Sequence, residues 1–359
     1  MANLMRGSQQ LFRRQPDETF QSLGEILAKC RDDAERSTDR WRPPKGMKPV
    51  VHEGRLELDL GDGNESFALN DWSFTQLCGL AKVSKDTLNR LSAETAGRVI
   101  SETLPGGNKP AQLFTRDDQI RSIHGHSYSR LHDSDLVSML MEFAVDFSPP
   151  QAGCTGGTGL YRGEQDLFCF MIDPTGWVEV GGEAFAPGFY AWNSEVGRRS
   201  VGIQSFWFQA VCANHIVWDA IDVTEFTRKH VGDVAGVLPE IRRVVEALVK
   251  KRDERRDSFA AVVRHAMETT LGDDAEEVVK LLSGRGITRQ LAKRALEMAA
   301  GQGRFTIFSV VDALTKIAGE VKNAGDRAEM DQRASGLFAL AKVPTPPWEE
   351  LEVARAGKR

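Results

Sequence analysis

The sequence changes character twice along the chain, and the order of these changes limits the folds that it can adopt. Up to about residue 150, helical and strand-like segments are mixed. From Leu160 to about Trp218 the chain is rich in β-branched and aromatic residues, with Gly and Pro between runs such as LFCFMI and SVGIQSFWFQAVC, which is typical of strands. After about Val234 the apolar residues recur at helical spacing. Mixed elements, then strands, then helices favour an α+β fold over a doubly wound sheet.

We therefore expect a central, mostly antiparallel sheet with an N-terminal helix and hairpin region and a C-terminal helical region. The strict alternation of RLELDL, followed by DGN, predicts a hairpin that ends near Leu69. The expected organisation has four parts: a polar helical leader at 1–45, an α+β core domain at 46–234, a helical region packing on the core at 235–342, and a flexible tail at 343–359.

The composition indicates a soluble, globular protein, with 41% hydrophobic and 27% charged residues. No apolar run approaches the roughly 18 residues that span a bilayer, and no apolar segment follows Arg13 and Arg14 as in a secretory signal. We expect a cytoplasmic location and no membrane partner. The net charge of -5 argues against coating nucleic acid by bulk attraction, but it permits a local basic groove.

The stretch HGHSYSRLHD is the strongest candidate for a metal site. His124 and His126 stand two residues apart, so on a strand both imidazoles would face the same way. A zinc site needs three or four protein ligands, and neither a CxxC pair nor a second histidine cluster is present. His124 and His126 are thus weak metal candidates, and we expect no metal and no cofactor. Phosphate-loop, dinucleotide-binding and nucleophile-elbow motifs are missing from the sequence as well.

The segment FYAWNSEVGRRSVGIQSFWFQAVCANHIVWDA combines rings with arginines. Rings on a sheet with interleaved cations can stack on bases and hold phosphates. Several of these rings must belong to the core, because FWFQAVC does not alternate cleanly. The residues that we expect to bind nucleic acid are Arg198, Arg199, Lys229, Arg242, Tyr190 and Trp192.

Four segments between about 65 and 340 resemble a phage- and plasmid-encoded family described as domain of unknown function 932. They are DWSFTQLCGLAKVSKDTL, IRSIHGHSYSRLHDSDLV, FYAWNSEVGRRS followed by FQAVCANHIV, and RKHVGD. The positions that match the family's pattern are Arg121, Tyr128, Asp135, Asn193, Asn214 and His230. The pattern does not call for histidine at 124, 126 or 132, which favours a structural role for that cluster. The resemblance implies work on DNA in a mobile element (replication, recombination or evasion of defence) and implies no reaction.

Three hypotheses follow. The first is a non-enzymatic DNA-binding protein of a phage, plasmid or other mobile element, which binds or anneals single strands or assists recombination as a homo-oligomer. The second is a metal-dependent nuclease or other hydrolase that uses His126, Tyr128, Asp135, Asn214 and His230. The third is a protein-interaction module acting against host defence, with the PTPPWEEL tail as an extended partner-binding strip.

Overall fold

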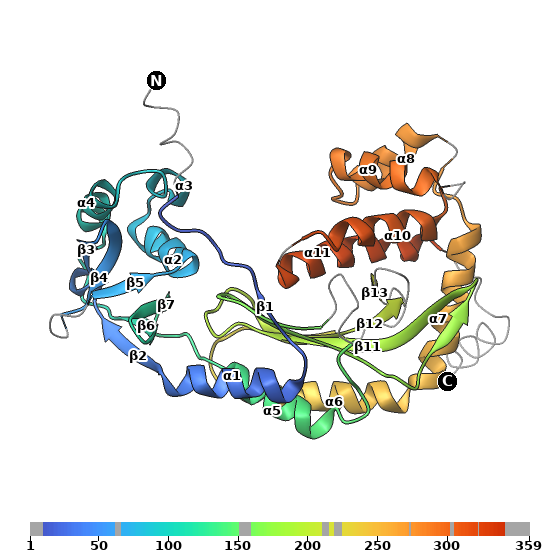
Figure 1. Ribbon diagram of the computed structural model, residues 1–359, viewed down its shortest axis with the longest axis horizontal. Helices are drawn as coiled ribbons and strands as arrows, with labels where there is room; N and C mark the ends of the chain where they lie inside the picture. Colours follow the sequence, from blue (N-terminus) through green and yellow to red (C-terminus); the bar gives the residue numbers. More distant parts are fainter. Residues whose placement is uncertain are drawn as a thin grey trace, which may run out of the picture.

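The computed structural model describes residues 10–61, 66–150, 159–209, 215–218, 225–272, 274–301, 305–321 and 323–341, with side chains for all of them but 215–218. The α+β class, the antiparallel sheet and the C-terminal helical region are confirmed (Figure 1). The N-terminal hairpin region forms a second sheet of its own. Among the described helices, none is long and apolar enough to cross a membrane.

Sheet A is the larger sheet, and all its strand pairs are antiparallel. Its order is β1-β8-β9-β11-β12-β13, while β10 pairs with β11 and β14 pairs with β12. Its strands are β1 (Glu18–Phe20), β8 (Leu160–Arg162), β9 (Leu167–Ile172), β10 (Val178–Val180), β11 (Glu183–Asn193), β12 (Val201–Gln209), β13 (His215–Trp218) and β14 (Glu225–Arg228).

Sheet B and the helices beside it form what we call the N-terminal lobe. The strand order of sheet B is β2-β6-β7-β5-β4-β3, in which β5 and β7 run parallel. Its strands are β2 (Ser37–Arg42), β3 (Lys48–His52), β4 (Arg55–Asp59), β5 (Ser66–Leu69), β6 (Ala111–Arg116) and β7 (Gln119–His124). The helices of this lobe are α2 (Asp71–Ala81), the single turn α3 (Lys85–Leu88), α4 (Ala93–Thr103) and the short 3-10 helix η2 (Pro44–Gly46).

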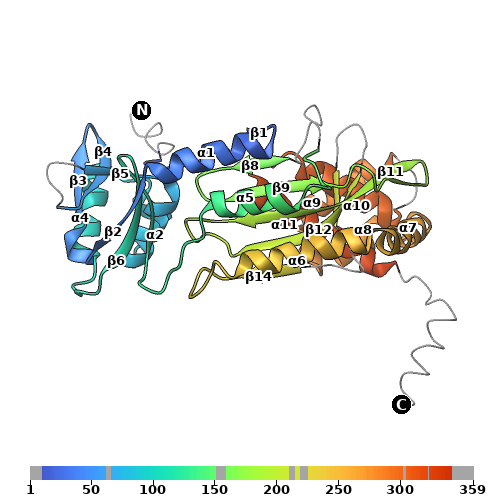
Figure 2. The same cartoon turned by 90° about the horizontal axis from the view of Figure 1, so that it is seen from below.

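Helices cover both faces of sheet A. Those on one face are α1 (Leu23–Glu35), α5 (Asp133–Phe143) and α6 (Val237–Lys250); Figure 2 shows them crossing that face. The remaining helices are α7 (Arg252–Glu268), α8 (Ala275–Ser283), α9 (Arg289–Ala300), α10 (Ile307–Ala318), α11 (Ala324–Ser335) and the 3-10 helix η3 (Gly336–Leu340). Of these, α11 lies over the other face of the sheet. β12 is buried on both faces, and its sequence VGIQSFWFQ places the polar side chains of Gln204, Ser205 and Gln209 in the interior beside its apolar residues.

The described part of 1–45, expected as a polar helical leader, contributes strands to both sheets. β1 pairs with β8 of sheet A, α1 follows, and β2 then pairs with β6 of sheet B. Before β1, the segment 10–17, which we call the N-terminal strap, runs from the N-terminal lobe toward sheet A (Figure 1). It begins against α3, where the backbone amide of Leu11 donates to the carbonyl oxygen of Asn89 at 3.0 Å. The tail 343–359 lies outside the described residues.

Candidate nucleic-acid interface

Two rows of side chains cross the face of sheet A beneath α11. Side chains alternate along a strand, and residues directly opposite in neighbouring strands share a face. The strand register therefore fixes both rows: Phe170, Tyr190, Gln204 and Glu225 form one, and Phe168, Trp192, Gly202 and Thr227 form the other. Sequence analysis found only Tyr190 and Trp192, because the other members become neighbours through strand pairing alone.

The rings of these rows stack on one another. Tyr190 lies 4.8 Å from Trp192 and 5.3 Å from Phe170 between ring centroids, with interplanar angles of 22° and 15°. Gly202 makes room for the indole of Trp192, since a Cβ at residue 202 would lie 2.4 Å from Trp192 Cζ2. The Tyr190 hydroxyl donates to Gln204 Oε1 at 3.0 Å. Burial raises the pKa of that hydroxyl, so it stays protonated and keeps donating.

A cavity of about 370 Å³ remains between these rings and α11. The helix contributes small residues where it meets the sheet, namely Ala324, Gly325 and Ala328. These small side chains let the backbone of α11 come close to sheet A. They also leave a space between the helix and the rings of the sheet. The cavity is lined by Phe168, Tyr190, Trp192, Arg199, Ser200, Gln204, Glu225, Thr227, Gly325, Ala328, Glu329 and Gln332.

Ion pairs hold α11 in this position. Arg199 lies 3.4 Å from Asp166 and 3.5 Å from Asp326, and it also pairs with Glu329. From the strap, Arg14 lies 3.5 Å from both Asp166 and Asp326. Burial raises the pKa of Asp166 to about 6, although both arginines oppose this shift.

The strap also caps the beginning of α11. The backbone amide of Ala324 donates to Asp17 Oδ2 at 2.8 Å, so a residue from the N-terminus satisfies a free donor of a C-terminal helix.

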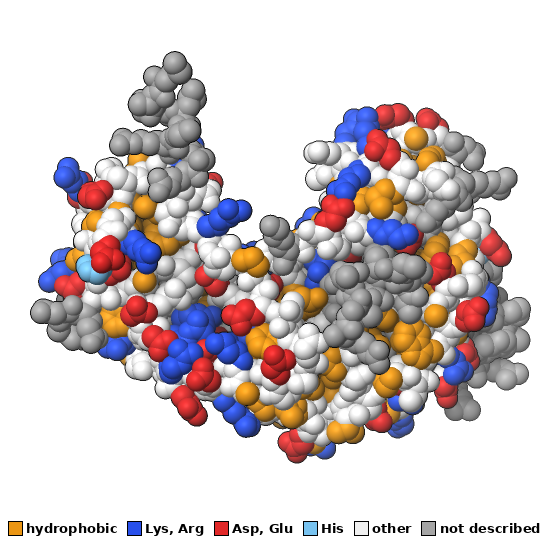
Figure 3. Space-filling view, in the orientation of Figure 1, with side chains coloured by type: hydrophobic (Ala, Val, Ile, Leu, Met, Phe, Trp, Pro, Cys, Tyr) orange, Lys and Arg blue, Asp and Glu red, His pale blue; other side chains and the backbone are white. Residues whose placement is uncertain are grey.

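Three of the six residues expected to bind nucleic acid thus meet at one cavity, but their rings do not form an exposed stacking surface. The rings of Tyr190 and Trp192 are only 6% and 7% exposed, because α11 covers them. Arg199 is engaged by carboxylates. Figure 3 shows the described acidic and basic side chains interspersed on the face in view, without a continuous basic strip.

The other three cations are dispersed. Arg242 lies on α6, on the opposite side of sheet A, where it contacts the Phe143 ring and pairs with Glu246 at 2.8 Å. Lys229 is exposed and follows β14. Arg198 is exposed, with its guanidinium carbon 5.6 Å from the Trp72 ring centroid, and it makes no ion pair with any described residue.

Four of the six residues assigned by resemblance, namely Arg121, Tyr128, Asn193 and His230, lie instead where the N-terminal lobe meets sheet A. The Tyr128 ring lies between two imidazoles, with centroid distances of 3.7 Å to His124 and 5.6 Å to His230. Its hydroxyl donates to the carbonyl oxygen of Glu195 at 2.7 Å. Asn193 Nδ2 donates to Leu131 O and to Asp133 Oδ1, both at 2.9 Å. These contacts indicate a structural joint.

Arg121 belongs to the same junction, since its Nη2 donates to the carbonyl oxygen of Glu164 at 3.0 Å. Asp135, by contrast, is exposed in the first turn of α5, and Asn214 lies outside the described residues.

The prediction that His124 and His126 lie together on a strand is wrong. β7 ends at His124, whose ring stacks on Tyr128, and His126 lies exposed in the following turn. In the part of the chain that the structure describes, no three or more His, Cys, Asp or Glu side chains are grouped to hold a metal.

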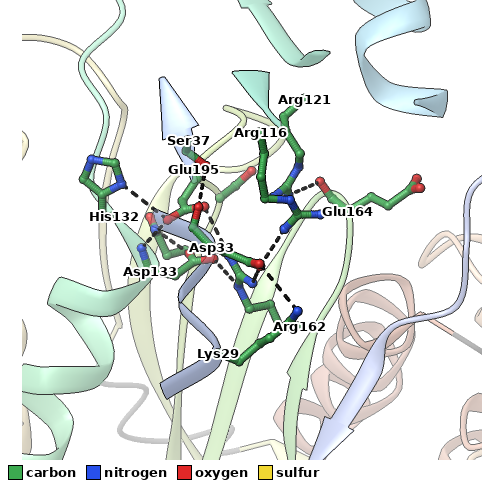
Figure 4. A network of polar contacts seen from close by, with 12 residues as sticks. Lys29, Asp33, Ser37, Arg116, Arg121, His132, Asp133, Arg162, Glu164 and Glu195 are labelled. Atoms are coloured by element: carbon green, nitrogen blue, oxygen red, sulfur yellow. Dashed lines mark hydrogen bonds and ion pairs between the residues drawn. The ribbon is translucent and has the colours of Figure 1, made fainter. Parts of the chain in front are cut away.

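A buried charge network lies beside this joint (Figure 4). Arg162 is at its centre: its Nε donates to Asp133 Oδ2 at 2.9 Å, its Nη2 to Glu195 Oε2 at 3.4 Å, and its Nη1 to Asp33. Burial, and next the charge of Glu195, raise the pKa of Asp133 to about 6. Burial works the same way on Glu195, but His132 and Arg162 overcome it and lower its pKa to about 2. Sequence analysis missed this network because its members come from distant segments.

Comparison with known proteins identifies no relative, since no family model, no curated protein and no solved structure matches the chain. The resemblance to the phage and plasmid family stays a prediction that rests on the residues quoted above.

Proposed function

We propose that this chain is a non-enzymatic protein that binds single-stranded nucleic acid by taking an unstacked base into the cavity beneath α11. The observation that supports this most is the meeting of Tyr190, Trp192 and Arg199 at a single cavity. Ring stacking and nearby cations are the features that proteins use to hold single strands.

The size and lining of the cavity fit such a ligand. A volume of about 370 Å³ lies at the lower end of the range typical of small-ligand sites. One wall is aromatic, and the amides of Gln204 and Gln332 offer hydrogen bonds to a base edge. A duplex base is paired and stacked, so the cavity favours a single strand or a strand end.

The phosphate contact is assigned to Arg198. It neighbours Arg199 in the turn between β11 and β12, and its guanidinium is exposed and forms no ion pair with a described residue, although its charge acts on the nearby Asp166 carboxylate. A phosphate bound there would also compete for the neighbouring Arg199. This competition would weaken the ion pairs of Arg199 with Asp326 and Glu329 on α11. The net charge of -5 then requires attraction to be local.

The remaining predictions belong to this proposal. We propose further that the protein belongs to a mobile element, forms a homo-oligomer and acts on DNA in the cytoplasm as an annealing or recombination accessory. These predictions are compatible with an attraction to DNA that is local rather than spread over the whole surface. A protein partner of the PTPPWEEL tail is a separate prediction.

Fluorescence polarisation with a short labelled single strand over a salt series tests the proposal. We expect saturable binding whose logarithm falls linearly with the logarithm of salt concentration. Arg198→Glu should weaken binding to every sequence and reduce the steepness of the salt dependence by about 0.7 to 1. Arg264→Glu is the matched control, because Arg264 is exposed on α7 and has no ion pair with a described residue. Binding without salt dependence, or equal loss in both variants, would contradict the proposal.

A further inference from the structure

Glu225 stands beside the ring wall of the cavity with its carboxylate uncommitted. It lies directly opposite Gln204 in the pairing of β12 with β14, so both side chains occupy the face that carries Tyr190. It lines the cavity and makes no ion pair with any residue that the structure describes. The other glutamate of the cavity, Glu329, is engaged by Arg199.

The hydrogen bond to Tyr190 fixes the orientation of the Gln204 side-chain amide. Gln204 Oε1 accepts the hydrogen of the Tyr190 hydroxyl, so Nε2 is the end of this amide that can donate to a ligand. Gln204 and Glu225 together therefore offer one donor followed by a carboxylate that only accepts.

We propose that the cavity selects guanine, with Gln204 donating to O6 and Glu225 accepting from N1–H and from the 2-amino group. This inference rests on the proposed function and names the base that the site takes. The Watson–Crick edge of guanine carries one acceptor followed by two adjacent donors, which complements this pair of side chains.

The other bases do not match the pair. Adenine and cytosine present a single amino donor next to a ring nitrogen that accepts, and thymine has one donor between two carbonyl oxygens. Thymine would place an acceptor against the Glu225 carboxylate, whereas adenine and cytosine can give it only the one amino donor instead of the two adjacent donors of guanine. Two parallel hydrogen bonds to a carboxylate are stronger than neutral ones, and an acceptor facing an acceptor is repelled.

The test compares labelled thymine strands that carry at one central position guanine, adenine, cytosine or inosine, which lacks the 2-amino group. Against the full-length protein we expect the guanine strand to bind about tenfold more tightly than the all-thymine strand. The inosine strand should fall between the two. Glu225→Gln should weaken binding of the guanine strand and should not weaken binding of the thymine strand, so the preference for guanine should be lost.

Glu179→Gln is the control, because Glu179 is an exposed glutamate on β10 that does not line the cavity. It should keep the preference for guanine. Equal affinity for all strands, or an unchanged preference in Glu225→Gln, would overturn the guanine assignment while the proposed function stands. If no strand binds at all, the proposed function itself fails.

Discussion

The ring of Tyr128 lies 3.7 Å from that of His124, and the two planes differ by only 6°. This stack joins the end of β7 in the N-terminal lobe to the turn at Gly197 between β11 and β12. A Cβ at residue 197 would lie 2.6 Å from His124 Cε1, so the glycine permits the close approach, and its φ of 69° also suits glycine. The ring of His230 also stacks on Tyr128, at a centroid distance of 5.6 Å, and burial lowers the pKa of His230.

The stack makes the protein sensitive to acid. Burial, then Arg130, lowers the pKa of His124 to about 3, so the folded state holds this imidazole neutral. The resulting stability is complete above the unfolded pKa of about 6.5 and is lost as pH falls toward 3. His124→Phe keeps a stacked ring and removes this titration. Between pH 6 and 4, the free energy of unfolding should fall less steeply in the variant, by up to about 1.4 kcal/mol per pH unit.

Denaturant unfolding at several pH values measures this difference. The pKa of Asp166, raised to about 6, acts with the opposite sign, because that carboxyl favours the folded state as pH falls through 6. It is present in both proteins, so it cancels in the comparison. Parallel pH profiles for wild type and variant would refute the role given to His124.

We predict that substitution of Arg162 lowers the free energy of unfolding more than substitution of an exposed arginine does. It is 6% exposed and contacts Asp33, Asp133 and Glu195. Arg162→Met leaves the buried Asp133 without a cationic partner in the described structure and removes one partner each from Asp33 and Glu195, and we expect a loss of about 3–5 kcal/mol in the free energy of unfolding. Arg243→Met is the control: Arg243 is exposed and pairs only with Glu240 in the described structure, so its loss should stay within about 0.5 kcal/mol. Similar losses in both variants would show that the network is not a structural centre.

Gly202 supports the ring wall. An added Cβ would lie 2.4 Å from Trp192 Cζ2 and 2.6 Å from the carbonyl oxygen of Phe226. We expect Gly202→Ala to cost about 1–3 kcal/mol of stability and to weaken strand binding by displacing the indole. Gly79→Ala, in α2 with no atom near its added Cβ, should be neutral or stabilise by up to about 1 kcal/mol. Thermal unfolding measures the change in stability, and fluorescence polarisation measures the change in binding. If Gly202→Ala binds strands as well as the wild type does, Trp192 does not contact the ligand.

Asp17 is expected to hold α11 over the cavity. Asp17→Ala removes the acceptor for the Ala324 amide and should cost about 0.5–2 kcal/mol. Hydrogen exchange should then accelerate in the first turn of α11. Ser22→Ala loses a similar cap, at α1, and should leave exchange in α11 unchanged. If α11 exchanges equally in wild type and Asp17→Ala, the strap does not hold the helix.

Much of the fold follows from local patterns. The run of apolar and β-branched residues from Leu160 predicted sheet A, and helical spacing after Val234 predicted the C-terminal helices. The partition into two sheets did not follow, because strand pairing such as β2 with β6 depends on contacts between distant segments. The site was found only in part: RRS and FYAW marked Arg199, Tyr190 and Trp192, whereas Glu225 joins them through the register of β14. The covering of the rings by α11 could not be predicted, since its AGDRAEMDQRAS sequence carries little apolar signal.

Photo-cross-linking tests whether a base enters the cavity beneath α11. The protein is irradiated with single strands that carry iodouracil or thioguanine, and the cross-linked peptides are identified by mass spectrometry. We expect cross-links at Tyr190 or Trp192 that are lost with excess unlabelled strand. Cross-links confined to other regions, such as α6 on the opposite side of sheet A, would contradict it.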